Sequence, residues 1–177
     1  MALITSVVTS AIIGVAVTTI PALFSRKSRL VKAKAKNNGE KFIKYSSFVF
    51  WVIYGGGALF SILGVLVYFL SEEPVAGIIF IILGLVFLLP MAVMQFFDTS
   101  VNWSSEYICG ARSGVSLRKN CILWDDVDFA KFHPYQTIQL KDKSGKSVFW
   151  SVYHNGWYEI IEDLRRIRPD IDTSDFD

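Results

Sequence analysis

The chain has 177 residues, of which 52% are hydrophobic and only 19% are charged, against roughly 25% charged residues in soluble proteins. Two Cys and five Pro exclude a disulfide scaffold, a collagen-like chain and a disordered chain. The net charge of +2 hides a segregation, because residues 1–45 carry eight Lys/Arg and one Glu, whereas residues 97–177 carry ten Lys/Arg and thirteen Asp/Glu. This segregation is typical of a membrane protein.

The first element is an apolar run over residues 2–24 that is rich in Ser and Thr. It lacks the basic start of a secretory signal, so residues 1–24 are predicted to form a transmembrane or membrane-associated helix rather than a cleaved signal peptide. Small residues recur every four positions along one face of this helix: Ser6, Ser10, Gly14 and Thr18. Such a stripe favours packing against another helix, but chance can also produce it in a segment of this composition.

Residues 25–45 follow as a short connector that is crowded with cations. These cations are Arg26, Lys27, Arg29, Lys32, Lys34, Lys36, Lys41 and Lys44. Because Lys and Arg beside membrane spans stay in the cytoplasm, the connector is predicted to be a basic cytoplasmic loop, with the amino terminus outside if residues 2–24 span. The same cations can attract anionic lipid headgroups, so lipid recognition stays open beside the topological role.

Two uncharged runs, residues 46–70 and 75–97, each exceed the about 20 helical residues that cross a bilayer. The short link between them contains Glu72 and Glu73, which must reach water. Residues 46–97 are therefore predicted to form a transmembrane helical hairpin. Its helices are expected to pack through small residues, within the hairpin or against a partner: Gly57, Ser61, Gly64, Gly77 and Gly84.

From residue 98 onward, polar and apolar residues alternate in five or six short runs, which indicates an antiparallel β-meander. Two such runs flank the loop at residues 142–145 and predict a hairpin. Apolar residues from Trp157 to Ile167 then follow helical spacing, and Pro169 ends that helix. The sheet and helix together predict an α+β fold, with the acidic residues 170–177 frayed.

Several motifs in this region resemble bacterial pleckstrin-homology-like domains. They are Ser-Ser-Glu-Tyr-Ile at 104–108, Ile-Leu-Trp-Asp-Asp-Val at 122–127, the hairpin loop at 143–146 and Val-Tyr-His-Asn-Gly-Trp at 152–157. The resemblance covers residues 98–169 and implies a small, partly open β-barrel closed by a C-terminal helix. Many bacterial members follow membrane helices, so the expected fold class is an α+β membrane protein with two or three transmembrane helices and a cytoplasmic pleckstrin-homology-like domain.

The sequence offers few groups for chemistry. His133 and His154 fall in predicted turns, and Cys109 and Cys121 lack the spacing of metal ligands. In the cytoplasm both cysteines are expected to be reduced, whereas an inverted topology would allow them to pair. No catalytic, cofactor-binding or metal-binding residue is predicted, and neither a nucleic acid nor a small-molecule substrate is expected as a ligand.

These features predict a non-enzymatic interaction or scaffold protein of the bacterial inner membrane. Its expected partners are the lipid bilayer and either a membrane protein or a second copy of the chain. Trp103 and Trp150 are candidate contact residues if they are exposed, whereas Trp124 and Trp157 are expected in the core. Two alternatives stay open: a small accessory or immunity subunit of a larger membrane complex, and an anionic-lipid-binding module that uses the basic connector.

Overall fold

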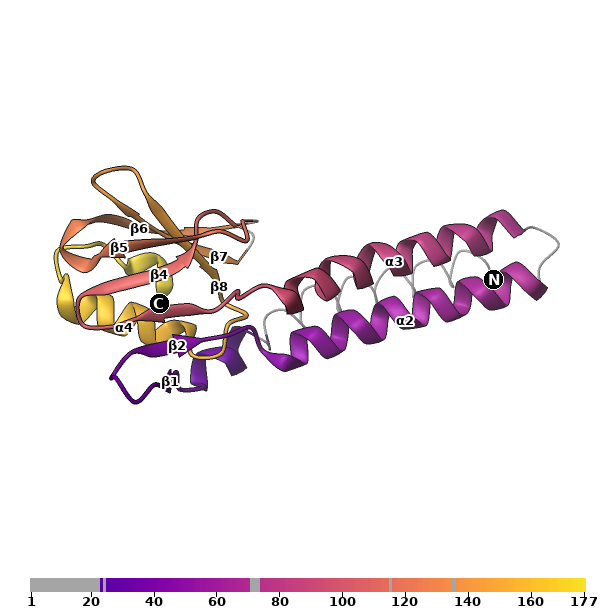
Figure 1. Ribbon diagram of the computed structural model, residues 1–177, viewed down its shortest axis with the longest axis horizontal. Coiled ribbons are helices and arrows are strands. Elements are labelled where there is room, and N and C mark those ends of the chain that lie inside the picture. The colour runs from indigo at the N-terminus through magenta and orange to yellow at the C-terminus, as the bar shows by residue number, and fades with distance from the viewer. Residues whose placement is uncertain (1–22, 24, 71–73, 115, 135) are drawn as a thin grey trace. The chain divides into compact units, whose positions relative to one another are not determined.

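The computed structural model describes residue 23 and residues 25–70, 74–114, 116–134 and 136–177, which belong to two compact units (Figure 1). One unit contains Tyr45–Ser100. The other, called the folded unit below, combines the described residues up to Lys44 with Val101–Asp177. The predicted stripe of Ser6, Ser10, Gly14 and Thr18 lies outside the described residues.

The unit Tyr45–Ser100 is a helical hairpin made of α2 (Ser47–Leu70) and α3 (Pro74–Phe96). Within the described part of the chain, α2 is the helix whose length and composition suffice to cross a membrane. A shorter apolar stretch, Pro74–Leu89, lies in α3. The helix nevertheless continues through Pro90, so this proline does not end it.

Small residues bring the backbones of α2 and α3 into close contact. A Cβ atom added at Gly64 would lie 2.7 Å from the backbone N of Ile81, and one at Gly77 would lie 2.5 Å from the backbone N of Tyr68. At Gly84, an added Cβ would collide with the Ser61 Oγ atom. Any side chain larger than hydrogen at these glycines would therefore force the helices apart.

The folded unit is built on an antiparallel sheet. Its strands in the described residues are β1 (Lys34–Ala35), β2 (Lys41–Ile43), β3 (Val101–Trp103), β4 (Tyr107–Ala111), β5 (Lys119–Leu123), β6 (Val127–His133), β7 (Thr137–Asp142) and β8 (Ser147–Ser151). Their order is β1-β2-β3-β4-β8-β7-β6, and β5 pairs with β4. The predicted α+β class with an antiparallel sheet is thus confirmed, and the sheet is open.

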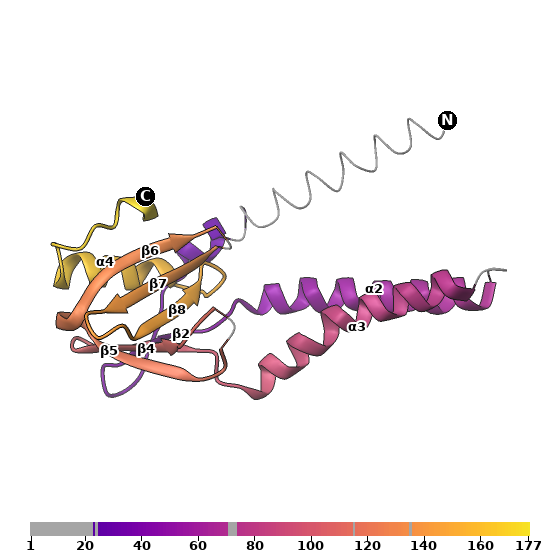
Figure 2. The same cartoon turned by 90° about the horizontal axis from the view of Figure 1, so that it is seen from above.

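The core lies between one face of this sheet and the helix α4 (Trp157–Ile167). Alternate residues of β7 point inward, with Ile138 and Leu140 fully buried, as the two-residue period of a strand requires. On α4 the helical spacing of Ile160, Ile161 and Leu164 presents a buried apolar stripe to them. Figure 2 shows β6, β7 and β8 side by side with α4 behind them.

The structure corrects the prediction of a loop over residues 25–45. Residues 25–30 are helical, and β1 and β2 extend the sheet, with Ile43 paired to Val101 across β2 and β3. β1 and β2 are short and rich in Lys, so the sequence shows no clear alternation of polar and apolar residues there. The buried Ile43 side chain holds β2 against the core. The sheet is therefore discontinuous in sequence, and the hairpin is inserted between two neighbouring strands.

The acidic tail is also ordered rather than frayed. The tail contains the short 3₁₀ helix η2 (Ser174–Phe176), in which Phe176 is only 3% exposed. Another short 3₁₀ helix, η1 (Trp124–Asp126), directly precedes β6. Arg165 holds this tail through its Nε–Thr173 Oγ1 hydrogen bond of 2.8 Å and its ion pair with Asp177. One buried aromatic ring and one arginine thus outweigh the acidic composition of residues 170–177.

Candidate functional site at the seam of the folded unit

The segment before the hairpin is joined to the start of α4 by a set of hydrogen bonds, here called the seam. The backbone N–H of Asn155 donates to the Lys44 carbonyl at 2.9 Å, and the N–H of Gly156 donates to the Ser28 carbonyl at 2.9 Å. The N–H of Ala33 donates to the Glu159 Oε2 atom at 2.8 Å. These bonds satisfy polar groups that would otherwise be left without partners beside the helix end.

Gly156 permits the close approach at the seam. Its φ of 84° lies in the left-handed region, where a side chain is strained. An added Cβ would also lie 2.8 Å from the backbone N of Ala33 and 3.1 Å from the Val31 carbonyl oxygen. Beside it, the Arg29 guanidinium stacks on the Tyr158 ring at 3.7 Å from the ring centroid, which adds a cation–π contact.

Charged side chains continue the seam from β2 to α4. The Lys41 Nζ atom lies 2.8 Å from Glu159 Oε1 and 2.9 Å from Asp163 Oδ2. The same Asp163 oxygen accepts a hydrogen bond of 2.8 Å from the indole N–H of the buried Trp103. The second Asp163 oxygen accepts from Arg166. Together with Ala33, these donors occupy all four carboxylate oxygens of Glu159 and Asp163.

The electrostatics of this network keep Lys41 charged. Burial of the ammonium group opposes ionisation, but hydrogen bonds to Glu159 and Asp163 outweigh it and raise the pKa of Lys41 above its ordinary value. Two cations and two carboxylates balance one another, so the network is electrically neutral. This paired cluster joins β2 to α4.

A cleft of about 310 Å³ opens beside the network. Its lining residues are Asn38, Gly39, Lys41, Trp103, Ser104, Ser105, Asp163 and Arg166. Asn38, Ser105 and Arg166 are exposed, so their side chains offer amide, hydroxyl and guanidinium groups to an incoming molecule. Most of the lining residues carry polar or charged groups, beside the apolar ring of Trp103. The arrangement is suited to hydrogen bonding with a polypeptide surface.

This cluster of Lys41, Glu159 and Asp163 was not predicted from the sequence. The one indication in the sequence was the spacing of Glu159 and Asp163, which lie four residues apart and therefore on one face of the predicted helix. Their partner Lys41 was read only as one of eight cations in a loop. The pairing across the inserted hairpin was not apparent from sequence spacing.

The four tryptophans of the folded unit lie in its core. Trp124 and Trp157 are 1% and 4% exposed, as predicted. Trp103 and Trp150, the candidate contact residues, are only 1% and 2% exposed, so neither meets the condition of exposure on which that role depended. Both occupy inward positions of the sheet, on β3 and β8, and their size makes them core residues.

The two cysteines differ from the expected reduced state. Cys109 and Cys121 form a disulfide, because the register of β4 and β5 places them directly opposite each other with Cα atoms 4.1 Å apart. His154 is buried, with Nδ1 3.0 Å from the Ser151 carbonyl oxygen, and His133 Nε2 lies 2.9 Å from Gln139 Oε1. Within the described ranges, no group of three His, Cys, Asp or Glu residues is placed to hold a metal ion.

Comparison with known proteins found no matching family model, no matching curated protein and no matching solved structure. The function proposed for this chain therefore depends on its own residues and geometry.

Proposed function

We propose that this chain is a non-enzymatic interaction protein of the bacterial inner membrane, in which a helical hairpin anchors a folded unit that binds a protein partner. The observation that carries the proposal is the insertion of α2 and α3 between β2 and β3. An anchor inserted inside a sheet cannot be removed without interrupting the chain between two paired strands. The saturated charges of the seam support a binding role rather than catalysis.

The membrane part of the proposal is supported by the uncharged helices. In this proposal α2 and α3 span the bilayer as an antiparallel pair. The cations of residues 26–44 lie within a few residues of these runs, which favours a cytoplasmic folded unit, whereas the Cys109–Cys121 disulfide favours the inverted topology. An open antiparallel sheet followed by α4 supports the resemblance to pleckstrin-homology-like domains.

The partner contact is placed at the cleft beside the seam. Its exposed groups, Asn38, Ser105 and Arg166, surround a neutral ion-pair network, which suits a polypeptide surface rich in hydrogen-bonding groups. Residues from β2, β3 and α4 line the cleft, so a partner would bind only the folded unit and not one isolated segment.

Site-specific photo-crosslinking tests this placement. A photoreactive residue replaces Ser105 at the cleft or, as a matched control, the exposed Ser144 in the β7–β8 loop. We expect one protein to cross-link from Ser105 only, and the same protein to co-purify in a fixed ratio with the full chain in mild detergent. Equal adducts from both positions, or a chain that purifies alone, would reject the proposal.

A second candidate function, an accessory subunit of a larger membrane complex, is favoured by Gly55 and Gly56. An added Cβ at either glycine would meet no atom within 4 Å, so this part of α2 presents small residues to open space. Gly55→Leu should then dissociate a helical partner in the membrane, leaving the cross-link at Ser105 unaffected. Retention of every co-purifying membrane protein by Gly55→Leu would rule out this role.

A further inference from the structure

Residues 25–44 have an inner side that is fixed to the folded unit. Ser28 and Ile43 are 2% and 1% exposed, and the backbone groups of Ser28, Ala33 and Lys44 take part in the seam. The segment is therefore held by its backbone and by a few small or apolar side chains. Arg29 stacks on Tyr158 and Lys41 pairs with Glu159 and Asp163, whereas the remaining cations of this segment are exposed.

Five of these exposed cations are here called the basic face: Arg26, Lys27, Lys32, Lys34 and Lys44. Among the described residues, the ion pairs of this segment involve Lys36 and Lys41 instead. Because the seam orders the backbone, the basic face is a fixed surface rather than a set of charges on a flexible loop.

Large apolar side chains lie among these cations. Leu30 is 80% exposed and Val31 is 39% exposed, although both are the kind of residue that folding normally buries. Basic residues interleaved with exposed aliphatic residues are typical of surfaces that lie in the headgroup region of a bilayer.

Chain connectivity keeps the basic face close to lipid. Only three residues separate the end of β2 at Ile43 from the start of α2 at Ser47. The three residue steps from Lys44 to Ser47 span at most about 11 Å, close to the screening length of about 10 Å at 0.1 M ionic strength. The surface charge of the membrane that holds α2 therefore acts on Lys44 and its neighbours.

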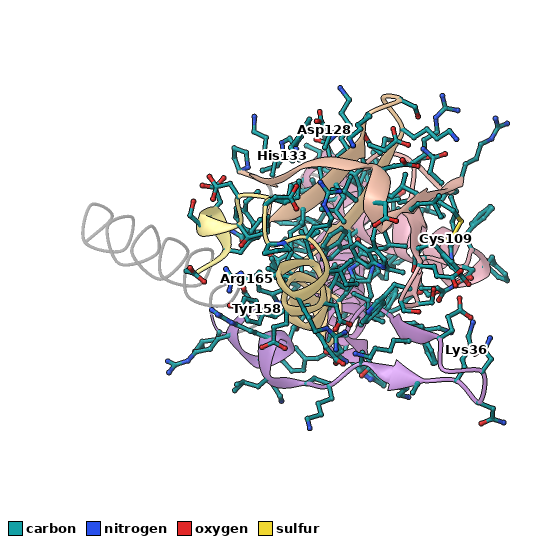
Figure 3. The ribbon with its side chains drawn as sticks, turned by 90° about the vertical axis from the view of Figure 1, so that its left-hand side faces the viewer. Lys36, Cys109, Asp128, His133, Tyr158 and Arg165 are labelled. Atoms are coloured by element: carbon teal, nitrogen blue, oxygen red, sulfur yellow. A yellow bond between two sulfur atoms is a disulfide. The ribbon has the colours of Figure 1, made fainter. Side chains whose placement is uncertain are left out.

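The rest of the folded unit, Val101–Asp177, carries ten Lys/Arg and twelve Asp/Glu, a net charge of −2. Asp125, Asp126 and Asp128 are exposed around the start of β6, which lies at the other end of the strand order from β1. Figure 3 shows the violet segment on one side of the folded unit and the labelled Asp128 on the other. This charge separation would orient the unit with its basic face toward an anionic surface.

We propose that the basic face, with Leu30 and Val31, docks on the anionic phospholipid surface of the membrane in which the chain is anchored. The cations are attracted to the negative surface charge, and the two apolar side chains insert among the headgroups. Docking therefore depends on the charge of the lipids and not on one kind of headgroup. It fixes the orientation of the folded unit at the bilayer. This docking goes beyond the binding of a protein partner and does not require it.

The test uses the full chain in lipid nanodiscs, with a nitroxide spin label at a Leu30→Cys substitution. Cys109→Ser and Cys121→Ser remove the disulfide-bonded native cysteines, and a label at Asp128→Cys is the matched control on the opposite side. We expect the label at position 30 to be shielded from an aqueous relaxation agent in phosphatidylglycerol-containing discs but not in phosphatidylcholine discs. High salt should reverse the shielding.

Charge removal gives the second arm of the test. Lys27→Gln/Lys32→Gln/Lys34→Gln should weaken docking on the order of one hundredfold, since each cation near an anionic surface contributes about a fivefold factor. The control Lys131→Gln/Lys143→Gln/Lys146→Gln removes three exposed cations elsewhere and should leave the shielding unchanged. Equal exposure of position 30 in both lipids, or equal effects of the two triple variants, would overturn the proposal. Docking restricted to a single phosphoinositide would overturn it as well.

Discussion

Ile43 and Val101 lie directly opposite each other on β2 and β3, although the whole α2–α3 hairpin separates them in the chain. Both side chains are 1% exposed, so this pair belongs to the core of the folded unit. The ends of the hairpin are thereby attached to two neighbouring strands. Folding of the sheet therefore requires that the two ends of the hairpin come together.

The first prediction concerns the buried carboxylate of the seam. Asp163→Ala leaves the Trp103 indole N–H without an acceptor and removes one of the two partners of Lys41. We expect a loss of about 2 kcal/mol in the free energy of unfolding, discounted from a fully buried pair because Lys41 is one-third exposed. Denaturant unfolding in detergent, followed by near-ultraviolet circular dichroism, measures it.

Arg166→Gln is the control for that substitution. The Arg166 side chain is 72% exposed, so its ion pair with Asp163 is screened by solvent. The variant should lose much less stability than Asp163→Ala. Similar losses in the two variants would mean that Asp163 contributes only as an exposed ion pair.

A second prediction uses two glycines with the same backbone conformation. Gly156 and Gly145 have φ values of 84° and 88°, but only Gly156 is crowded by other atoms. Gly145→Ala should cost about 1 kcal/mol through backbone strain alone. Gly156→Ala should cost clearly more and should expose Arg26 and Lys27 to trypsin, because the added methyl displaces Ala33. Equal stability and equal cleavage in the two variants would contradict the close packing of Gly156 against Ala33 at the seam.

The third prediction concerns packing inside the hairpin. Gly84→Leu places a side chain against Ser61 and the Gly57 carbonyl, so α2 and α3 should separate. Energy transfer between dyes attached at the helix ends should fall. Gly55→Leu adds the same volume where the structure leaves space and should preserve the transfer. A loss of transfer in Gly55→Leu alone would contradict this packing.

A fourth prediction follows from the raised pKa of Lys41. The stability that its ion pairs contribute is fully present below the unfolded-state pKa of about 10.4, and it is lost as the pH rises through the higher folded-state pKa. Alkaline titration of the unfolding midpoint should therefore show a steeper fall for the native chain than for Lys41→Gln. The exposed Lys143→Gln should behave like the native chain. Parallel curves for the native chain and Lys41→Gln would mean that the pair adds no stability.

The fifth prediction concerns orientation. With the folded unit in the cytoplasm, Cys109 and Cys121 should resist a membrane-impermeant thiol reagent applied to intact cells after mild reduction. The reagent should label both residues once the cells are permeabilised. Labelling in intact cells would place the disulfide outside, in agreement with the oxidising compartments where disulfides persist, and would reverse the proposed topology.

Much of the fold was predictable because its signals are local. The helical period of Trp157–Ile167 and the uncharged run Ser47–Leu70 specify α4 and α2 from sequence alone. The candidate site was not predictable in the same way. Lys41 meets Glu159 and Asp163 across an inserted hairpin, and no short-range pattern encodes a contact at that separation.

The sequence by itself determined which segments are apolar, which are charged and which secondary structures they favour, since these properties depend on side-chain type and spacing. Only the tertiary structure decided that the basic segment completes the sheet and that Trp103 is buried on Asp163. It also decided that Cys109 faces Cys121. The physical reason is that strand register and burial are settled by the whole core, which forms from residues far apart in the chain.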